Sequence, residues 1–510
     1  MKTKRQLWLC LILCCFALPA QADLRFLLPP VSSPAVMYAA FTPLANYLSH
    51  AINQKITLSF SANLQSFYNQ ADQNTPQIVL FCPIAYIRSA HQQAYYPLAG
   101  VIPTPGGNHS VIVVRRNSPI HNVLQLRNRS FVMGDPACAA SSLVPLSMFR
   151  ELGMTPKSFS VFRQSGSDQS ALMDVAARFY DATAVAKNVA APYIYSGTLR
   201  AIADAEVGPG DLLAASAGVP ANIRTKLTAA LLTAKMQDPV SIQALGGLAA
   251  GFKAINDGDY NALRTLYQEI HGVKLLPKVP QEAMTLGIPP TFTPIAAYQI
   301  FAPLQKALNE ATGLPVQLVI PHNEQSFVAD GRAGKFDFAL LTPRMVAMEK
   351  TQMLPIAQSV PRHDLHGLAI IRRDMSTPGT GPSTGPLRIA FASPYCSARS
   401  LAKAKLLRLA GNRPVTWVPE GSEHAVFTAL AENRATLGIV RTATVMALEK
   451  ELPGIWSIVQ SAGRAPVWTL VGKRQLPLGI HSAVKQQVAK MPLNVLDTAG
   501  FMRFSILPDA

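Results

Sequence analysis

The chain has 510 residues and a formal net charge of +17, and this length suits two to four domains rather than a single core. Hydrophobic residues make up 49% of the sequence and charged residues 15%, a balance that excludes an intrinsically disordered protein. No apolar run reaches the roughly 18 residues that a membrane-spanning helix needs, so the sequence also excludes a polytopic protein integral to the membrane.

The N-terminus has the three parts of a secretory signal peptide. Positively charged residues come first, followed by an apolar stretch at 7–18 that is too short to span a bilayer, and by Ala-Gln-Ala at 20–22. We therefore expect residues 1–22 to be removed near Ala22 and the mature chain to be exported to the periplasm. The signal carries three cations and no anions, so the net charge falls from +17 to +14.

Three cysteines remain after export: Cys82, Cys138 and Cys396. The odd number allows at most one intrachain disulfide and leaves at least one thiol over. The sequence contains no CxxC or CxxCH spacing, so neither a structural zinc site nor a c-type haem is predicted.

Short apolar runs alternate with helix-like segments along the mature chain. In chain order, its first half is predicted to contain strands at 24–28, 56–60, 78–81, 111–114 and 130–133 and helices at 41–52 and 171–178. Such alternation predicts an α/β fold whose parallel or mixed sheets are covered on both faces. Each half is longer than one compact sheet needs, which indicates two α/β lobes per half.

The second half of the chain repeats the first. At an offset of 260, residues 24–30 fall on 284–290, and Gln-Ser-Phe at 65–67 falls on Gln-Ser-Phe at 325–327. Because many such matches follow one another in order, chance does not explain them, and a tandem duplication is predicted. The expected division is a signal peptide at 1–22, a first module at 23–275, a linker at 276–283 and a second module at 284–510.

Five motifs stand in a fixed order in the first module. They are the strand at 25–29, Phe-Cys-Pro-Ile-Ala-Tyr at 81–86, the apolar strand at 109–116, the strand with Asp-Pro at 131–136 and Ser-Gly-Ser at 165–167. This series resembles the periplasmic phosphonate/phosphite-binding proteins, the solute receptors of ABC importers. The resemblance implies tandem class II periplasmic-binding-protein modules, each holding a ligand between two α/β lobes that close by hinge motion. It also implies a binding protein that is not an enzyme and needs no cofactor.

The segment after Asp-Pro departs from the family pattern. In the family a Ser-Thr-Ser stretch opens a helix there, and hydroxyls with free N–H groups at a helix N-terminus suit an anionic phosphoryl group. Cys138, Ala139 and Ala140 stand in its place in the first repeat, and Cys396 and Ser397 in the second. The backbone N–H groups of these helix starts remain candidates to hold an oxyanion. The alternative is that the small side chains pack the lobes together.

Four further candidates follow from the same resemblance. Tyr86 matches the family's turn tyrosine and is predicted to line the cleft, or alternatively to be a buried ring with a bonded hydroxyl. The residue after Ser167 is Asp168 where the family has a histidine, and Lys187 stands near a ligand-facing Asp of the family, its alternative being a surface cation. The predicted ligand-binding residues are therefore Tyr86, Cys138, Ala139, Ala140, Ser167, Asp168, Lys187, Cys396 and Ser397.

The sequence thus predicts an exported solute-binding protein for an ABC permease or a membrane sensor. Its positive charge favours a small anionic ligand, phosphonate-like or another oxyanion. One alternative is an accessory or interaction protein whose clefts bind no solute, because the ligand motifs have diverged. Another is a thiol- or metal-handling protein that uses Cys82 and Cys138. The basic residues are scattered without an aromatic platform, so no nucleic-acid partner is predicted.

Overall fold

The computed structural model describes residues 23–105, 107–136, 138–278, 283–349, 351–362, 367–373, 385–392, 398–465 and 467–508. The expected signal peptide lies outside these residues. Two compact units are present: one comprises the residues up to 81 together with 95–102 and 213–254, and the other comprises 82–94, 103–212 and the chain from 255 onward. Within the described residues, no helix is both long enough and apolar enough to cross a membrane.

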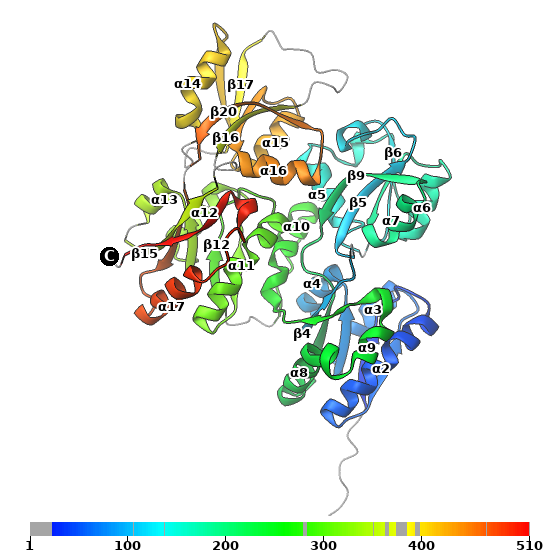
Figure 1. Cartoon of the computed structure of the whole chain (residues 1–510). Helices are drawn as coiled ribbons and strands as arrows, with labels where there is room; N and C mark the ends of the chain where they lie inside the picture. The colour runs from blue at the N-terminus through cyan, green and yellow to red at the C-terminus, as the bar shows by residue number, and fades with distance from the viewer. Residues whose placement is uncertain are drawn as a thin grey trace, which may run out of the picture. The chain divides into compact units, whose positions relative to one another are not determined.

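The first unit is a six-stranded sheet with helices against it (Figure 1). Its strands lie in the order β11 (Gly251–Lys253), β4 (Tyr95–Ile102), β10 (Leu212–Ser216), β3 (Gln77–Phe81), β1 (Leu24–Leu28) and β2 (Ile56–Phe60). Its helices are α2 (Pro34–Ile52), α3 (Leu64–Ala71), α8 (Ala221–Gln237) and α9 (Pro239–Ala244). Phe26 of β1 packs edge-to-face on Phe41 of α2, with the ring centroids 5.9 Å apart, which anchors the longest helix of this unit to the sheet.

The predicted helix at 41–52 begins earlier than expected, at Pro34. Ser33 caps it by accepting a hydrogen bond from the N–H of Val36, and a proline suits the first helical turn because its missing N–H would have no partner there. Thr293 and Pro294 repeat this start in the second module. The cap was present in the sequence, but the apolar pattern alone did not reveal it.

The second unit contains the second sheet of the first module. Its strands lie in the order β7 (Val161–Gln164), β6 (Ser130–Met133), β8 (Ala182–Ala186), β5 (His109–Arg115) and β9 (Leu199–Glu206). The helices of this part are α5 (Leu143–Glu151), α6 (Asp168–Ala176) and α7 (Lys187–Tyr195). The same unit also holds α4 (Pro83–Gln92), the 3-10 turn η5 (Asp257–Tyr260) and α10 (Asn261–His271).

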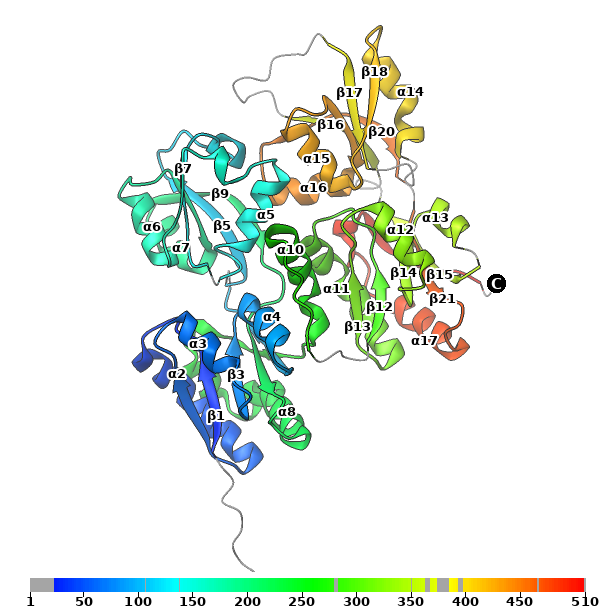
Figure 2. The same cartoon turned by 180° about the vertical axis from the view of Figure 1, so that it is seen from behind.

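The rest of this unit is the second module, which has two sheets (Figure 2). One sheet has the order β13 (Val316–Val319), β12 (Met284–Gly287), β14 (Phe338–Leu341), β21 (Thr469–Lys473), β15 (Met353–Pro361) and β22 (Phe501–Ile506). The other has the order β18 (Val415–Pro419), β17 (Leu387–Phe391), β19 (Leu437–Arg441), β16 (Gly367–Arg373) and β20 (Trp456–Arg464). Its helices are α11 (Pro294–Thr312), α12 (Glu324–Arg332), α13 (Pro343–Met348), α14 (Ala398–Ala410), α15 (Glu423–Ala431), α16 (Thr442–Glu451) and α17 (Leu478–Ala489).

The strand orders confirm the duplication. The order β7-β6-β8-β5-β9 of the first module corresponds strand by strand to β18-β17-β19-β16-β20 of the second. The six-stranded sheets also correspond, since β2-β1-β3-β10-β4 matches β13-β12-β14-β21-β15 and each sheet adds one edge strand. The α/β fold with two sheets per module is therefore as the sequence predicted.

Candidate functional site

The second sheet of the first module presents the carboxyl ends of three parallel strands at one edge. Strands β6 and β7 run parallel to each other, and β8 runs parallel to β6 on its other side. In open α/β sheets, ligands bind outside this edge, where the loops lead into the following helices. Here those loops lead into α5, α6 and α7, which places most of the predicted first-module residues at one edge.

Asp168, the first residue of α6, ties these loops together. Its Oδ1 accepts a hydrogen bond of 2.9 Å from the N–H of Asp135, and its Oδ2 accepts bonds of 2.8 Å from the Ser141 hydroxyl and 3.0 Å from the N–H of Ala186. Gly134 leaves the space that the carboxylate needs, since a Cβ there would lie 2.3 Å from Asp168 Oδ1. The carboxylate therefore joins the loop between β6 and α5 to the end of β8.

Cys138, Ala139 and Ala140 precede a helix rather than open one. Helix α5 begins at Leu143, so the predicted helix start at Cys138 is wrong in position. Residues 139–142 form turns instead; the N–H of Ser141, for example, donates to the Cys138 carbonyl at 3.1 Å. Ala139 and Ala140 are buried. That these residues contact a ligand stays a prediction.

Ser167 is the N-cap of α6. Its hydroxyl oxygen accepts a 3.1 Å hydrogen bond from the N–H of Ser170 and also lies 2.9 Å from that residue's hydroxyl. This use of the side chain follows directly from the preference of helix starts for serine.

Lys187 is paired with a carboxylate of the same sheet. Its ammonium group binds Asp204 Oδ2, while Nδ1 of His109 lies 2.7 Å from Asp204 Oδ1. Burial alone would raise the pKa of Asp204, but the hydrogen bonds from Lys187 and His109 outweigh it and lower this pKa below its usual value. A ligand anion would compete with Asp204 for the Lys187 ammonium group.

Tyr86 is fully buried within the second unit. Its hydroxyl donates a 2.7 Å hydrogen bond to Asp257 Oδ1, and its ring lies 4.8 Å from the ring of Tyr260. Arg264 holds the same carboxylate with two bonds, of 2.9 Å to Oδ2 and 2.6 Å to Oδ1. Burial, and then the nearby Asp257 charge, raise the pKa of Tyr86 well above its usual value. Tyr86 is therefore a buried ring with a bonded hydroxyl, which is the second of the two interpretations that the sequence allowed.

Cys82 and Cys138 are both thiols of intermediate exposure. They are close enough for the charge of one to affect the other, although burial is the larger reason why the pKa of Cys82 is raised. Among the residues that the structure describes, no group of three or more His, Cys, Asp or Glu side chains is placed to hold a metal ion. Cys396 and Ser397 lie outside the described residues.

In the second module, Glu423 corresponds to Asp168. It is the first residue of α15, and its Oε2 accepts hydrogen bonds of 2.9 Å from the N–H of Arg441 and 2.7 Å from the Thr444 hydroxyl. The Arg441 guanidinium adds an ion pair of 3.3 Å to Oε1 and lies over the ring of Trp468. In both modules, the carboxylate of the first residue of one helix thus lies at the start of the next helix along the chain.

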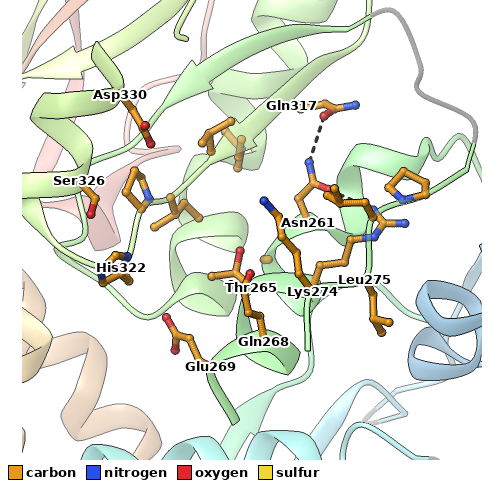
Figure 3. Close-up of a pocket in the computed structure, with 18 of the residues that line it drawn as sticks. Asn261, Thr265, Gln268, Glu269, Lys274, Leu275, Gln317, His322, Ser326 and Asp330 are labelled. Carbon is orange, nitrogen blue, oxygen red and sulfur yellow. Dashed lines mark hydrogen bonds between the residues drawn. The ribbon is translucent and has the colours of Figure 1, made fainter. Parts of the chain in front are cut away.

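One cavity within the second unit has no counterpart in the sequence-based prediction. It has a volume of about 940 Å³ and is lined by α10 and by the segments around β13 and α12. Figure 3 shows Lys274 and Gln268 on one side of it and His322 and Asp330 on the other. The residues come from distant parts of the chain without a shared motif, so no signal in the sequence pointed to this cavity.

The comparisons with known proteins identify the family. A family model described as "ABC transporter, phosphonate, periplasmic substrate-binding protein" matches residues 26–260 and again 286–510. The chain belongs to this family and contains its domain twice. It is a family of binding proteins rather than enzymes, as the sequence predicted.

Several solved structures are similar to this chain. PhnD1 from Prochlorococcus marinus (MIT 9301), in complex with methylphosphonate, is 17% identical over 49% of this chain and 99% of its own, with a TM-score of 0.43. XAC2383 from Xanthomonas citri, bound to ATP, is 16% identical over 49% of this chain and 98% of its own, with a TM-score of 0.42. The B. pertussis BvgS periplasmic domain is 13% identical over 94% of this chain and 89% of its own, with a TM-score of 0.31. No curated protein matches this sequence.

Proposed function

We propose that this protein is an exported receptor that binds a small solute in the periplasm and presents it to an ABC permease. The observation that carries the proposal is the family domain, which occurs twice over nearly the whole mature chain. In the first module, the loops after β6, β7 and β8 form the candidate contact region, because solutes of α/β proteins bind at this strand edge. Binding is non-covalent and drives closure of the lobes.

Two features bear on the charge of the solute, and they point in opposite directions. The net charge of +14 expected after loss of the signal supports an anion, since a positive field raises the local concentration of anionic solutes. Against it, the hydrogen-bond donors around Asp168 already serve a carboxylate, and Lys187 already serves Asp204. The sequence-based expectation of an anionic ligand therefore stays a prediction.

The test is a solute screen on the exported chain without its signal peptide. We expect at least one solute among phosphonates, amino acids, amines and small neutral compounds to raise the unfolding temperature and to reduce the radius of gyration measured by X-ray scattering. A chain that binds none of these solutes, by either measurement and by calorimetry, would contradict the proposal.

A second candidate function is favoured by one observation. In each module, a carboxylate of the chain itself accepts the hydrogen bonds at the start of the following helix. An accessory protein whose modules bind no solute also accounts for this geometry. Capture of the permease by the solute-free chain, with no gain when solutes are added, would support this function over the receptor.

A further inference from the structure

The carboxylate of Asp168 lies where several hydrogen-bond donors converge, as they would around a bound anion. Three hydrogen-bond donors from two segments meet at its carboxylate: the N–H of Asp135 and the Ser141 hydroxyl from the loop between β6 and α5, and the N–H of Ala186 at the end of β8. Ala186 is the N-cap of α7, and the N-terminus of a helix attracts negative charge because its first N–H groups lack partners within the helix. Converging N–H groups of this kind bind phosphate and carboxylate anions in proteins.

The second module repeats this arrangement with different side chains. Glu423 accepts from the N–H of Arg441, which is the N-cap of α16, and from the hydroxyl of Thr444. Aspartate in one module and glutamate in the other reach the same kind of donors from the first residue of the equivalent helix. The duplicated fold therefore has a negative side chain at this position in both copies.

The surroundings of the first-module site are built for this carboxylate. A side chain at position 134 would displace this carboxylate, because a Cβ there would lie 2.3 Å from Asp168 Oδ1. Burial raises the pKa of the nearby Cys138 thiol to about 12, and the charges of Asp168 and Asp135 add to this rise. The acidic groups thus disfavour a further negative charge beside them.

We infer that Asp168 is a specificity-determining residue, a built-in anion that blocks the anion site of the first module and directs the module toward solutes that are neutral or positively charged at this point. The side chain is covalently attached, so its effective concentration at the donors is far above that of a free anion. An incoming phosphate would have to displace it and then lie beside its charge. The part of this inference that names the solute class rests on the proposed function, whereas the blocked anion site does not.

The experiment compares Asp168→Ser with the unmodified chain by calorimetric titration with inorganic phosphate and with methylphosphonate. Serine keeps a good residue for the first turn of α6 but removes the carboxylate from the three donors. We expect the variant to bind at least one of these anions about a hundredfold more tightly than the unmodified chain, because two or three charge-assisted hydrogen bonds become available.

Asp174→Ser is the matched control. It removes the same charge from the same helix α6 and leaves Asp168 in place, so its anion affinity should equal that of the unmodified chain. Asp168→Asn serves as a second variant if the serine variant does not fold, and it should gain about tenfold in anion affinity because the charge is lost while the shape is kept.

Two results would overturn the inference: an unmodified chain that binds phosphate as tightly as the variants, or folded variants that gain no affinity over Asp174→Ser. A failure of the unmodified chain to bind any solute would count against the proposed function instead. It would not alter the comparison between Asp168→Ser and its control.

Discussion

Tyr86 and Asp257 lie 171 positions apart in the sequence and are joined by a hydrogen bond of 2.7 Å. The bond links helix α4 to the turn before α10, and both groups are buried. We therefore expect Tyr86→Phe to lower the free energy of unfolding by about 2 kcal/mol, since it removes one hydrogen bond to a charged group. Chemical denaturation followed by tyrosine fluorescence measures this loss.

The control for this prediction is Tyr195→Phe. Tyr195 is 96% exposed, so removing its hydroxyl should leave stability unchanged within about 0.5 kcal/mol. Equal stability of the two variants would show that the Tyr86 hydroxyl contributes nothing to the fold.

The ion pair between Asp257 and Arg264 should matter more than the tyrosine. Both side chains are at most 7% exposed, and removing Arg264 leaves the buried Asp257 charge without this opposite charge. We expect Arg264→Met to cost about 3–5 kcal/mol. The double variant Asp257→Asn with Arg264→Met should be more stable than Arg264→Met alone, because no buried charge then remains. A double variant that is no more stable would contradict this account of the cost.

The sequence predicted the fold well because the fold depends on local patterns. Strands at 24–28, 56–60 and 130–133 were placed correctly from their apolar runs alone. The repeat then carried the architecture to the second half, as the matching strand orders confirm.

The candidate site could be predicted only in part, because its chemistry depends on which side chains meet in space. The sequence showed that Asp168 replaces a family histidine, but not that its carboxylate bonds to the loops of Asp135 and Ala186. Likewise, the partners of Tyr86 and Lys187 are Asp257 and Asp204, both distant in sequence. Such pairings arise from the packing of whole elements and leave no local pattern.

The two described thiols are expected to react slowly in the native protein. Burial first, and then neighbouring carboxylates, raise the pKa of both Cys82 and Cys138, so little of the reactive thiolate is present at pH 8. Treatment with iodoacetamide at pH 8 should label both residues at least about tenfold more slowly before unfolding than after it, as measured by mass spectrometry. Rapid native labelling, or a disulfide between these residues in a non-reduced digest, would contradict the prediction and revive the thiol-handling alternative.

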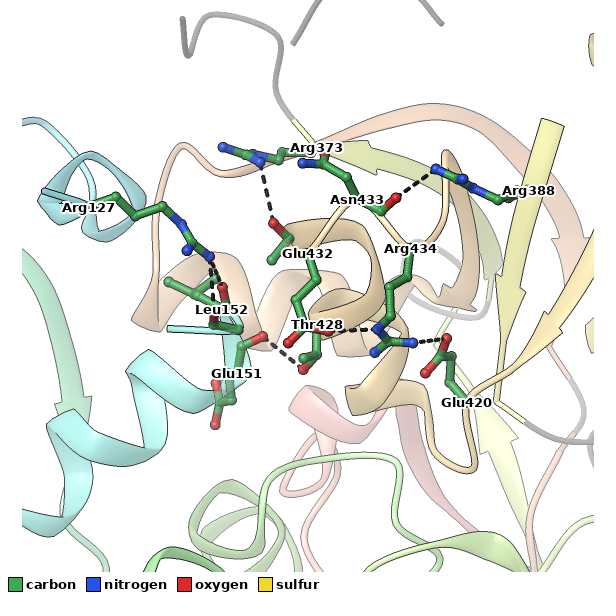
Figure 4. Close-up of polar contacts among 12 residues, drawn as sticks. Arg127, Glu151, Leu152, Arg373, Arg388, Glu420, Thr428, Glu432, Asn433 and Arg434 are labelled. Atoms are coloured by element: carbon green, nitrogen blue, oxygen red, sulfur yellow. Dashed lines mark hydrogen bonds and ion pairs between the residues drawn. The ribbon is translucent and has the colours of Figure 1, made fainter. Parts of the chain in front are cut away.

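Within the second unit, several carboxylates lie where α5 meets the second module. Figure 4 shows Glu151 beside Thr428 of α15, whose hydroxyl donates a 2.9 Å hydrogen bond to the Glu151 carbonyl. Glu151 is 5% exposed, its Oε1 lies 3.5 Å from His424 Nε2, and it lines a small cavity together with Glu206 and Glu451. Burial, followed by the charge of Glu451, raises the pKa of Glu151 well above its usual value.

Glu451 should make the protein less stable as the pH rises. Burial raises its pKa from 4.5 to about 7; Lys450 opposes this rise, and Glu206 adds to it. Between pH 4.5 and 7 the folded protein therefore holds a proton that the unfolded chain has lost, and the free energy of unfolding falls with rising pH by at most about 1.4 kcal/mol per pH unit. The actual slope is smaller because Glu451 is only partly buried. His424 acts in the opposite sense, since burial lowers its pKa to about 4.

Glu451→Gln tests this contribution, because it removes the titrating group; it also removes the charge that raises the pKa of Glu151, and both effects act in the same direction. The variant should match the unmodified chain near pH 5, where Glu451 is protonated in the folded state, and should unfold at a higher temperature at pH 8. Unfolding temperatures measured from pH 5 to pH 8 test this, with Glu310→Gln as the control because Glu310 is 51% exposed and should leave the profile unchanged. Parallel profiles for the unmodified chain and Glu451→Gln would show that Glu451 titrates normally in the folded protein.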